Sequence, residues 1–376
     1  FALVNIIEPG VSQDDSIRVR NRIGYELWRD ANDVVKLDEN CYGCDPENAQ
    51  YVSDLQSKEE KPNDWVQDKM AKAEQEKRNQ REFGPLKPLV DIVPTNIFRA
   101  LSDMSMLQII FFAIFFGVVL LLIDPEKAKP VISLVDGLNE VFVRMIWVVM
   151  KAMPFFVFAL MAGQIVKAAG SDPDRFFELL DFLLRYSIVV VIGLLFMMFI
   201  FYPTVVRLFV KQLTFRKFLG GIRDAQITAF STSSSVATLP VTMDCVHNNL
   251  GVSERTSSFV LPIGATVNMD GTSLYQAVAV VALAQFHMVD LSLAQQLTII
   301  VTATLASIGA AAVPSAGLVL MIIVLESVGL NPAWIALIFP VDRILDMCRT
   351  AVNVTGDATV SSIVANSEGE MSTSTP

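Results

Sequence analysis

The sequence has little charge for its length, few histidines and no lysine after Lys217. Charged residues make up 18% of its 376 residues and hydrophobic residues 52%, whereas a soluble domain carries about 25% charged residues. This composition excludes an ordinary soluble domain and favours a membrane protein. The net charge of −10 points to no particular partner, because the charged side chains are concentrated before residue 90. We expect no nucleic-acid partner.

The first residues also lack the features of a secretory signal peptide. Residues 1–7 are apolar and run directly into Glu8, without a charged n-region or a cleavage site. We interpret residues 1–10 as the end of a membrane span that begins upstream, so the sequence is expected to be a fragment. Residues 11–90 are polar and charge-rich. Within them, the stretch from Trp65 to Arg81 predicts either a solvated helix or a flexible spacer.

Three long apolar runs follow, at about 107–123, 141–166 and 187–210. Each is long enough to cross roughly 30 Å of hydrocarbon at about 1.5 Å per residue. Basic residues mark the cytoplasmic loops. Two such groups lie in the loops that flank the second and third runs, namely Lys127 and Lys129, and Arg207, Lys211, Arg216, Lys217 and Arg223. The polar segment 11–90 should therefore lie on the opposite, extracytoplasmic side.

Cysteine is scarce too, with four in the chain. Cys41 and Cys44 form a CxxC pair in the polar segment, while Cys245 and Cys348 stand alone in apolar surroundings. On an oxidising side of the membrane the CxxC predicts a local disulfide. A metal site would need two further ligands that the segment does not offer. A redox-catalytic pair would need a thioredoxin-like strand–helix pattern, which is lacking.

Beyond residue 224 the apolar segments are interrupted by small and polar residues. The interruptions at 228–240 and 306–317 each lie between apolar stretches too short to span alone. Non-helical backbone at membrane depth is tolerated only inside the protein or along a wet cavity. We therefore predict two re-entrant hairpins, with tips near Ser234 and Val313 that approach the last span. Paired interruptions of this kind indicate a transporter binding site.

The last apolar segment carries a polar stripe, spaced so that its members fall on one helical face. Its members are Asp342, Asp346, Arg349, Asn353 and Asp357. Each charge in a membrane helix costs about 2–3 kcal/mol, so the stripe must face protein or water. It could be an ion-paired structural stripe. However, Arg349 cannot neutralise three aspartates, even with partial help from Arg343, and the surplus negative charge favours a cation.

The preceding segment contains Gly264, Asn268, Asp270 and Gly271 near its middle. This pattern predicts local unwinding, where free carbonyls and a carboxylate can surround a hard cation. A kink held by an Asn–Asp pair is the alternative. Sodium is favoured over protons, because a relay needs Glu or His inside the bundle. His247 and His287 lie near predicted span ends, and position 276 is glutamine.

Taken together, these motifs resemble the dicarboxylate/amino acid:cation symporter family, which includes excitatory amino acid transporters and an archaeal aspartate transporter. The resemblance covers nearly all of 91–365. It rests on Asn5 to Gly10, Asp91-Ile92-Val93-Pro94-Thr95-Asn96, the serine-rich 228–240, Asn268-Met269-Asp270-Gly271-Thr272, 306–317, and Asp346-Met347-Cys348-Arg349-Thr350 with Asn353-Val354-Thr355-Gly356-Asp357.

The resemblance implies an all-α integral membrane, multi-span transporter with two re-entrant hairpins and inverted repeats. It implies the end of a third span at 1–10, an extracytoplasmic loop at 11–90, scaffold spans at 91–181, a transport core at 182–365 and a polar tail at 366–376. It also implies a non-enzymatic, multi-pass protein of the cell membrane, surrounded by lipid and assembled as a homotrimer. Transport by an elevator-like movement belongs to the same expectation.

The resemblance further assigns roles to residues. Arg349 would bind the substrate side-chain carboxylate, Thr272 would assist it, and Asp346 would bind the amino group. The α-carboxylate would be held by Ser234, Ser235, Thr350 and Asn353, and Val313 would also contact the substrate. About two or three sodium ions would bind. One site would use Gly264, Asn268, Asn353 and Asp357, another Thr266, Met269, Ser307, Ile308 and Ala310, and a third Asp270 and Asn268 with ligands upstream of Phe1.

Some positions depart from the family pattern. An additional arginine is expected where Ser233 or Met347 stands, and Arg343 is a possible substitute for it. Ala312 replaces a common glycine, and Gln276 replaces the proton-carrying acid of the animal members. The sequence thus predicts a sodium-driven symporter of aspartate, glutamate or C4-dicarboxylates. The rivals are a proton-coupled dicarboxylate carrier, an anion channel using the same stripe, and a membrane thiol oxidoreductase built on Cys41 and Cys44.

Overall fold

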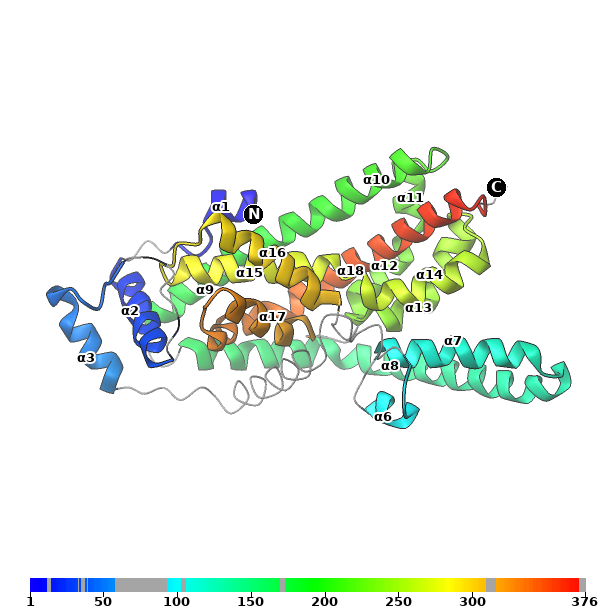
Figure 1. The fold of residues 1–376 in the computed structure, drawn as a ribbon, viewed down its shortest axis with the longest axis horizontal. Coiled ribbons are helices and arrows are strands. Elements are labelled where there is room, and N and C mark those ends of the chain that lie inside the picture. Colours follow the sequence, from blue (N-terminus) through cyan, green and yellow to red (C-terminus); the bar gives the residue numbers. More distant parts are fainter. Residues whose placement is uncertain are drawn as a thin grey trace.

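The computed structural model is helical throughout the part of the chain that it describes (Figure 1). It describes residues 1–11, 15–32, 34, 38, 40–57, 93–102, 106–169, 173–308 and 316–371. Within these ranges there is no strand, and one isolated bridge pairs Val252 with Met371. The predicted helix at Trp65–Arg81 lies outside the described residues. The all-α prediction is confirmed.

The amino-terminal elements are short. They are α1 (Ala2–Ile7), α2 (Asp15–Ala31), the 3-10 turn η1 (Pro46–Asn48), α3 (Ala49–Ser57) and α6 (Ile97–Ser102). Next, α7 (Met106–Leu122) and α8 (Pro125–Ala169) pack against each other, and Figure 1 shows this pair projecting beyond the other helices. The predicted run at 107–123 matches α7. By contrast α8 begins well before 141, because Pro125 suits a helix start and the following charged residues are good helix formers.

A continuous helical run connects α9 (Pro173–Phe196), the π-helix η2 (Met197–Phe201) and α10 (Tyr202–Phe209). Within the described residues, its portion Phe177–Phe209 is the helix that is both long and apolar enough to cross a membrane. At about 1.5 Å per residue it exceeds the roughly 30 Å of a hydrocarbon core. The sequence placed this span at 187–210, and its start there was wrong, since the first turns carry charged residues that hydropathy discounts. The predicted boundary between scaffold and transport parts, at 181 and 182, falls inside α9 and stays a prediction.

The carboxyl-terminal half surrounds α18. Its elements are α11 (Phe215–Gly221), α12 (Arg223–Thr232), α13 (Ser235–Asp244), η3 (Cys245–Asn249), α14 (Glu254–Val267), α15 (Asp270–Phe286), α16 (Leu293–Ile308), α17 (Ala316–Ser327), η4 (Pro332–Trp334) and α18 (Ile335–Ser367). Helices α8, α9, α10, α12, α13, α14, α15 and α17 all contact α18. Other helices therefore pack around α18, and Figure 1 shows it lying among α12, α14 and α15.

Two helix breaks occur where the sequence predicted interruptions. Between α12 and α13, Ser233 adopts a left-handed conformation with φ 51°, and Ser234 caps α13 by accepting a hydrogen bond from the Ala237 amide. Between α14 and α15, Asn268 and Met269 are not helical. The predicted unwinding at Asn268 is confirmed. The second tip, with Ala310, Ala312 and Val313, lies outside the described residues, and whether the hairpins are re-entrant stays a prediction.

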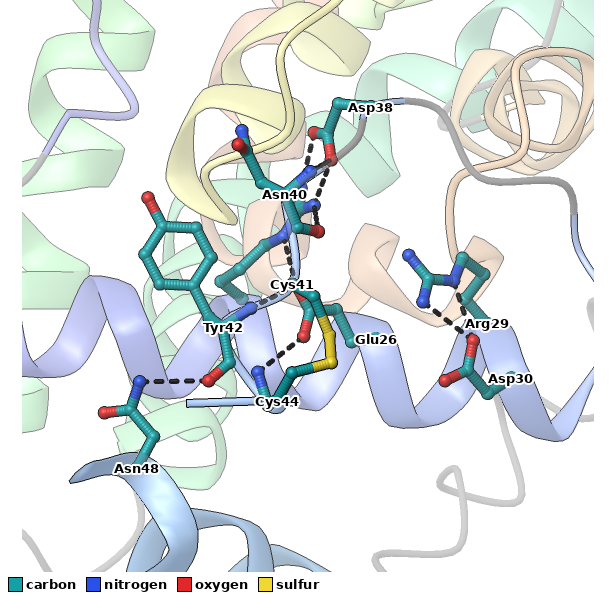
Figure 2. Close-up of a disulfide and its surroundings, with 11 residues drawn as sticks. Glu26, Arg29, Asp30, Asp38, Asn40, Cys41, Tyr42, Cys44 and Asn48 are labelled. Carbon is teal, nitrogen blue, oxygen red and sulfur yellow. Dashed lines mark hydrogen bonds and ion pairs between the residues drawn. A yellow bond between two sulfur atoms is a disulfide. The ribbon is translucent and has the colours of Figure 1, made fainter. Parts of the chain in front are cut away.

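Helices α2 and α3, with the described residues between them, form a unit that we call the cap. The predicted disulfide between Cys41 and Cys44 is present, with the two Cα atoms 5.4 Å apart (Figure 2). Beside it the Glu26 carboxylate accepts hydrogen bonds from the amides of Tyr42 and Gly43 and pairs with Arg22 at 3.0 Å. Arg22 also pairs with Asp38. The disulfide thus closes a loop around a buried carboxylate.

The cap is anchored to the ends of two core helices. The Arg22 guanidinium donates to the Met288 carbonyl at 2.9 Å, just after α15. The Tyr25 hydroxyl donates to the Gly329 carbonyl at 3.1 Å, just after α17, and the Tyr25 ring packs on Trp334. Burial raises the pKa of Tyr25 to about 12. The phenol therefore remains a neutral donor across the physiological pH range.

Candidate functional site

The polar stripe of α18 is buried along its whole length. The helix is unbroken from Ile335 to Ser367, although Pro340 lies inside it. Its five members, Asp342, Asp346, Arg349, Asn353 and Asp357, are each no more than 3% exposed, and the neighbouring Thr350 is 4% exposed. The prediction that this stripe faces the protein interior is confirmed. The stripe holds three buried carboxylates and one buried guanidinium, which contacts Asp342 and Asp346 but not Asp357, so negative charge is in excess at the centre of the helix bundle.

Arg349 lies among acidic and aromatic groups. Its Nε donates to Asp346 Oδ1 at 2.8 Å, and its Nη1 is 3.9 Å from Asp342 Oδ1. Its guanidinium carbon lies 4.6 Å from the centre of the Tyr275 ring, and the Tyr275 hydroxyl donates to Asp342 at 2.8 Å. Arg343 approaches Asp346 at 3.6 Å. The guanidinium is thus held in one plane by a carboxylate at its edge and a ring at its face.

One nitrogen of Arg349 has no hydrogen-bond partner among the described residues. That nitrogen is Nη1, which is fully buried. Gly317, at the start of α17, lies against it, and a Cβ added to Gly317 would come within 2.6 Å of Nη1 and 2.7 Å of the Thr272 methyl group. A buried N–H without an acceptor costs free energy. A ligand with a carboxylate would remove that cost.

The break between α14 and α15 lies against the carboxyl-terminal part of the stripe, at Asn353 and Asp357. The Asn268 amide donates to Asp357 Oδ1 at 2.9 Å, and Asn353 Oδ1 accepts the Gly271 amide at 2.7 Å. The Asn353 amide nitrogen points to Met269 Sδ at 3.3 Å and Thr272 Oγ1 at 3.4 Å. These contacts bring together Asn268, Asn353 and Asp357, which are three of the four residues predicted for the first sodium site.

Two glycines allow this close approach. A Cβ on Gly264 would lie 2.6 Å from Asp357 Oδ1, and a Cβ on Gly356 would lie 2.6 Å from Asn268 Nδ2. Asp357 is 3% exposed, and the group that donates to its carboxylate is the neutral amide of Asn268. The oxygen donors of this set suit a hard cation such as sodium. The arrangement therefore fits a bound cation, because a buried carboxylate without a cationic partner is costly.

The second predicted sodium set is only partly assembled by the described residues. Thr266 and Ser307 are buried, and α14 and α16 contact each other. The Thr266 hydroxyl donates to the Ile263 carbonyl, and the Ser307 hydroxyl lies 2.6 Å from that of Ser273. Ile308 is 45% exposed. Ala310 lies outside the described residues, so the role of this set stays a prediction.

The remaining substrate residues lie around α18. Helices α12 and α13 both contact α18, and Ser235 is buried at the start of α13. The Thr350 hydroxyl donates to the Asp346 carbonyl one turn before it. Ser234 is engaged as the cap of α13. Val313 lies outside the described residues. These positions are compatible with the expected roles and do not test them.

Some contacts of the site involve residues that sequence reasoning missed. The Tyr202 hydroxyl donates to Asp270 Oδ2 at 2.6 Å from α10. Tyr275 contacts Arg349, and Gln226 donates to Thr355 at 3.0 Å. Tyr202 carries a hydroxyl and precedes Pro203 in an otherwise apolar run. This polar side chain is the one sequence signal that could have indicated its role. Gly317 gave none, because a glycine among small residues does not reveal a close approach.

The residues on which the rival functions would depend are the two histidines and the four cysteines. His247 lies in η3 and His287 follows α15, where its ring stacks on Trp334 at 3.6 Å, so both are at helix ends as expected. Within the described residues no group of three or more His, Cys, Asp or Glu side chains could hold a metal ion. Cys41 and Cys44 form a disulfide with each other, while Cys245 is buried and Cys348 half-buried.

Comparison with known proteins gives a consistent result. The "Sodium:dicarboxylate symporter family" matches the chain over residues 58–367. The chain is 42% identical over 264 residues to "Excitatory amino acid transporter" of Caenorhabditis elegans, which covers 70% of the chain and 51% of that protein. The cap, at residues 15–57, lies outside the family match.

Two mouse proteins are similarly close. "Excitatory amino acid transporter 1" of Mus musculus is 41% identical over 265 residues, covering 70% of the chain and 48% of that protein. "Excitatory amino acid transporter 2" of Mus musculus is 41% identical over 273 residues, covering 72% of the chain and 46% of that protein. The chain thus spans about half the length of the curated relatives that it matches.

Proposed function

Because the chain belongs to the sodium:dicarboxylate symporter family, we propose that it carries acidic amino acids or C4-dicarboxylates into the cell together with sodium. As a member of that family it is a membrane protein and a transporter, not an enzyme. Its relatives named as excitatory amino acid transporters support an acidic amino acid as the substrate.

The observation that carries the proposal is the environment of Arg349. This arginine is 2% exposed, its Nε is occupied by Asp346, and its Nη1 has no hydrogen-bond acceptor among the described residues. A substrate carboxylate would accept from the free nitrogen, and an amino group would pair with Asp346. An α-amino dicarboxylate supplies both groups at once, whereas a neutral amino acid lacks the second carboxylate.

Sodium would be drawn by the remaining negative charge. The set formed by Asp357, Asn353 and Asn268 with the Gly264 backbone offers oxygen ligands beside the substrate residues. Asn353 belongs to both groups, so the substrate and the ion would share a residue. The shared residue couples the two binding equilibria, and coupled transport requires that each ligand favours binding of the other. Ser234, Ser235, Thr350 and Val313 would complete the substrate site, and Thr266, Met269, Ser307, Ile308 and Ala310 a second ion site.

The larger architecture follows from family membership. We expect a multi-pass protein of the cell membrane, a homotrimer, and an elevator-like movement of a transport core at 182–365 against scaffold spans at 91–181. Two re-entrant hairpins and inverted repeats belong to the same expectation. The enclosed position of α18 is compatible with a core that moves as one body.

The test is substrate competition in proteoliposomes. Arg349→Cys or Arg349→Thr should lose aspartate recognition and gain small neutral amino acids, with sodium dependence retained. In the wild type a neutral substrate would leave Nη1 of Arg349 without an acceptor, which costs about 1–3 kcal/mol and corresponds to a preference of roughly 5- to 150-fold for an acidic substrate. Arg185→Cys, which removes a surface-paired arginine of α9, is the matched control. If serine competes with labelled aspartate equally well in wild type and variant, the substrate assignment fails.

A further inference from the structure

Tyr202 occupies a position that the proposed ion sites do not explain. It is the first residue of α10, directly after the π-helix Met197–Phe201, and it is 4% exposed. Its hydroxyl donates to Asp270 Oδ2 at 2.6 Å, across 68 positions of sequence. Single-turn π-helices often mark functional sites because the extra residue re-aims the side chains that follow. Here the residue directly after the π-helix is Tyr202, and its hydroxyl contacts Asp270.

Three helices meet around this hydroxyl. Tyr202 comes from α10, Asp270 begins α15, and Gly356 belongs to α18. A Cβ on Gly356 would lie 2.9 Å from the Tyr202 hydroxyl and 2.6 Å from Asn268 Nδ2. Gly356 directly precedes Asp357. The hydroxyl therefore lies among the groups to which a cation would bind, although nothing in the family pattern described above includes it.

We propose that Tyr202 is a positioning residue for sodium, which holds the Asp270 carboxylate in the orientation that the ion requires. The proposal rests on the proposed function. A hydrogen bond to Oδ2 fixes the plane of the carboxylate and leaves Oδ1 free to bind an ion. A lysine or arginine could fix it equally well, but its charge would compete with the cation. A phenol donates a hydrogen bond and adds no charge.

The alternative is that the phenol only satisfies a half-buried carboxylate. The two roles differ in what they change. A structural role would lower the stability of the protein without ions and leave its apparent sodium affinity unchanged. A positioning role would weaken sodium binding while the ion-free protein keeps its stability, because outer hydrogen bonds to ligating groups typically change metal affinity about 10–100-fold.

The experiment uses the full-length transporter carrying Tyr202→Phe. Two measurements are made, namely sodium-dependent thermal stabilisation of the purified protein and the sodium concentration for half-maximal aspartate uptake in proteoliposomes. We expect both to show roughly tenfold weaker sodium binding, with little change in the aspartate KM at saturating sodium. Thr204→Val is the matched control, since it removes a hydroxyl of the same helix that bonds to its own backbone.

A second variant keeps the proposal falsifiable if Tyr202→Phe does not fold. Gly356→Ala introduces a methyl group beside both the Tyr202 hydroxyl and the Asn268 amide, and should weaken sodium in the same direction. Unchanged sodium dependence in either folded variant, or lower ion-free stability with no shift in sodium dependence, overturns the inference. Wild-type uptake without any need for sodium would instead refute the proposed function.

Discussion

Gly264 and Asp357 lie so close together that any side chain on the glycine would meet the carboxylate, since a Cβ there would be 2.6 Å from Asp357 Oδ1. The two residues come from α14 and α18, which pack against each other. Only a glycine leaves room for the carboxylate and a carbonyl to share a ligand. This contact gives a direct test of the first ion site.

Gly264→Ala should weaken sodium dependence without changing which substrates compete. The methyl group displaces Asp357 from the Asn268 amide, and a well-packed site does not absorb such a shift cheaply. Asp357→Asn should act in the same direction by removing the negative charge. Sodium titration of aspartate uptake measures both. Gly163→Ala, at a glycine of α8 with open space around it, should leave the titration unchanged. Equal sodium curves for Gly264→Ala and wild type would contradict the site.

Position 276 is a glutamine and not a proton-carrying acid. We therefore expect that uptake requires neither internal potassium nor a pH gradient. The Gln276 side chain is fully buried, and its Nε2 donates to the Gly317 carbonyl at 2.8 Å, next to Arg349. An amide keeps this donor at every pH, so the contact does not depend on a proton. Uptake into vesicles loaded with sodium, potassium or choline tests the point. A strict need for internal potassium would contradict it.

Gln276→Glu should introduce a pH dependence that the wild type lacks. Only a protonated carboxyl can donate to the Gly317 carbonyl, so the contact would be present at low pH and lost as the pH rises through the pKa of the new acid. Aspartate affinity should fall in the same direction. Parallel pH profiles of the apparent aspartate KM for wild type and variant measure the effect, and identical profiles would exclude it.

The disulfide should stabilise the cap but not contribute to transport. Closing so short a loop restricts the unfolded cap by about 2 kcal/mol, and the amides of Tyr42 and Gly43 stay on Glu26 only while the loop is closed. The double variant Cys41→Ser, Cys44→Ser should therefore exchange amide hydrogens faster across 15–57. A reductant should have that effect on wild type and none on the variant. Loss of aspartate uptake in the variant would contradict this division.

The carboxyl terminus should become less firmly attached in acid. The hydroxyls of Ser253 and Thr256 donate to Glu370 at 2.6 and 2.5 Å, and these hydrogen bonds lower the pKa of that carboxyl below its usual value of 4.5. The folded state therefore gains stability above that value and loses it as the pH falls below it. Glu370→Gln should flatten the dependence of the thermal midpoint on pH below about pH 5. Glu368→Gln, at an exposed position, is the control. If the thermal midpoint of the wild type depends on pH as weakly as that of Glu370→Gln, the contact is refuted.

The sequence predicted the structure best where charge or backbone chemistry allows few conformations. The stripe from Asp342 to Asp357 could only face inward, because exposure to lipid is too costly. The break at Asn268 followed from small and polar residues in an apolar segment. Helix starts were less accurate, since the charged first turns of α8 and α9 do not look like membrane spans. Tyr202 and Gly317 were missed because their importance lies in distances between helices, which no local pattern encodes.

The cap is attached through main-chain carbonyls, those of Met288 and Gly329, and these atoms are present whatever side chain stands at either position. Both acceptor residues have a left-handed backbone, with φ 54° at Met288 and 73° at Gly329, so the cap depends on the backbone conformation of these two loops. A unit joined in this way can change most of its own sequence as long as these two backbone contacts are kept.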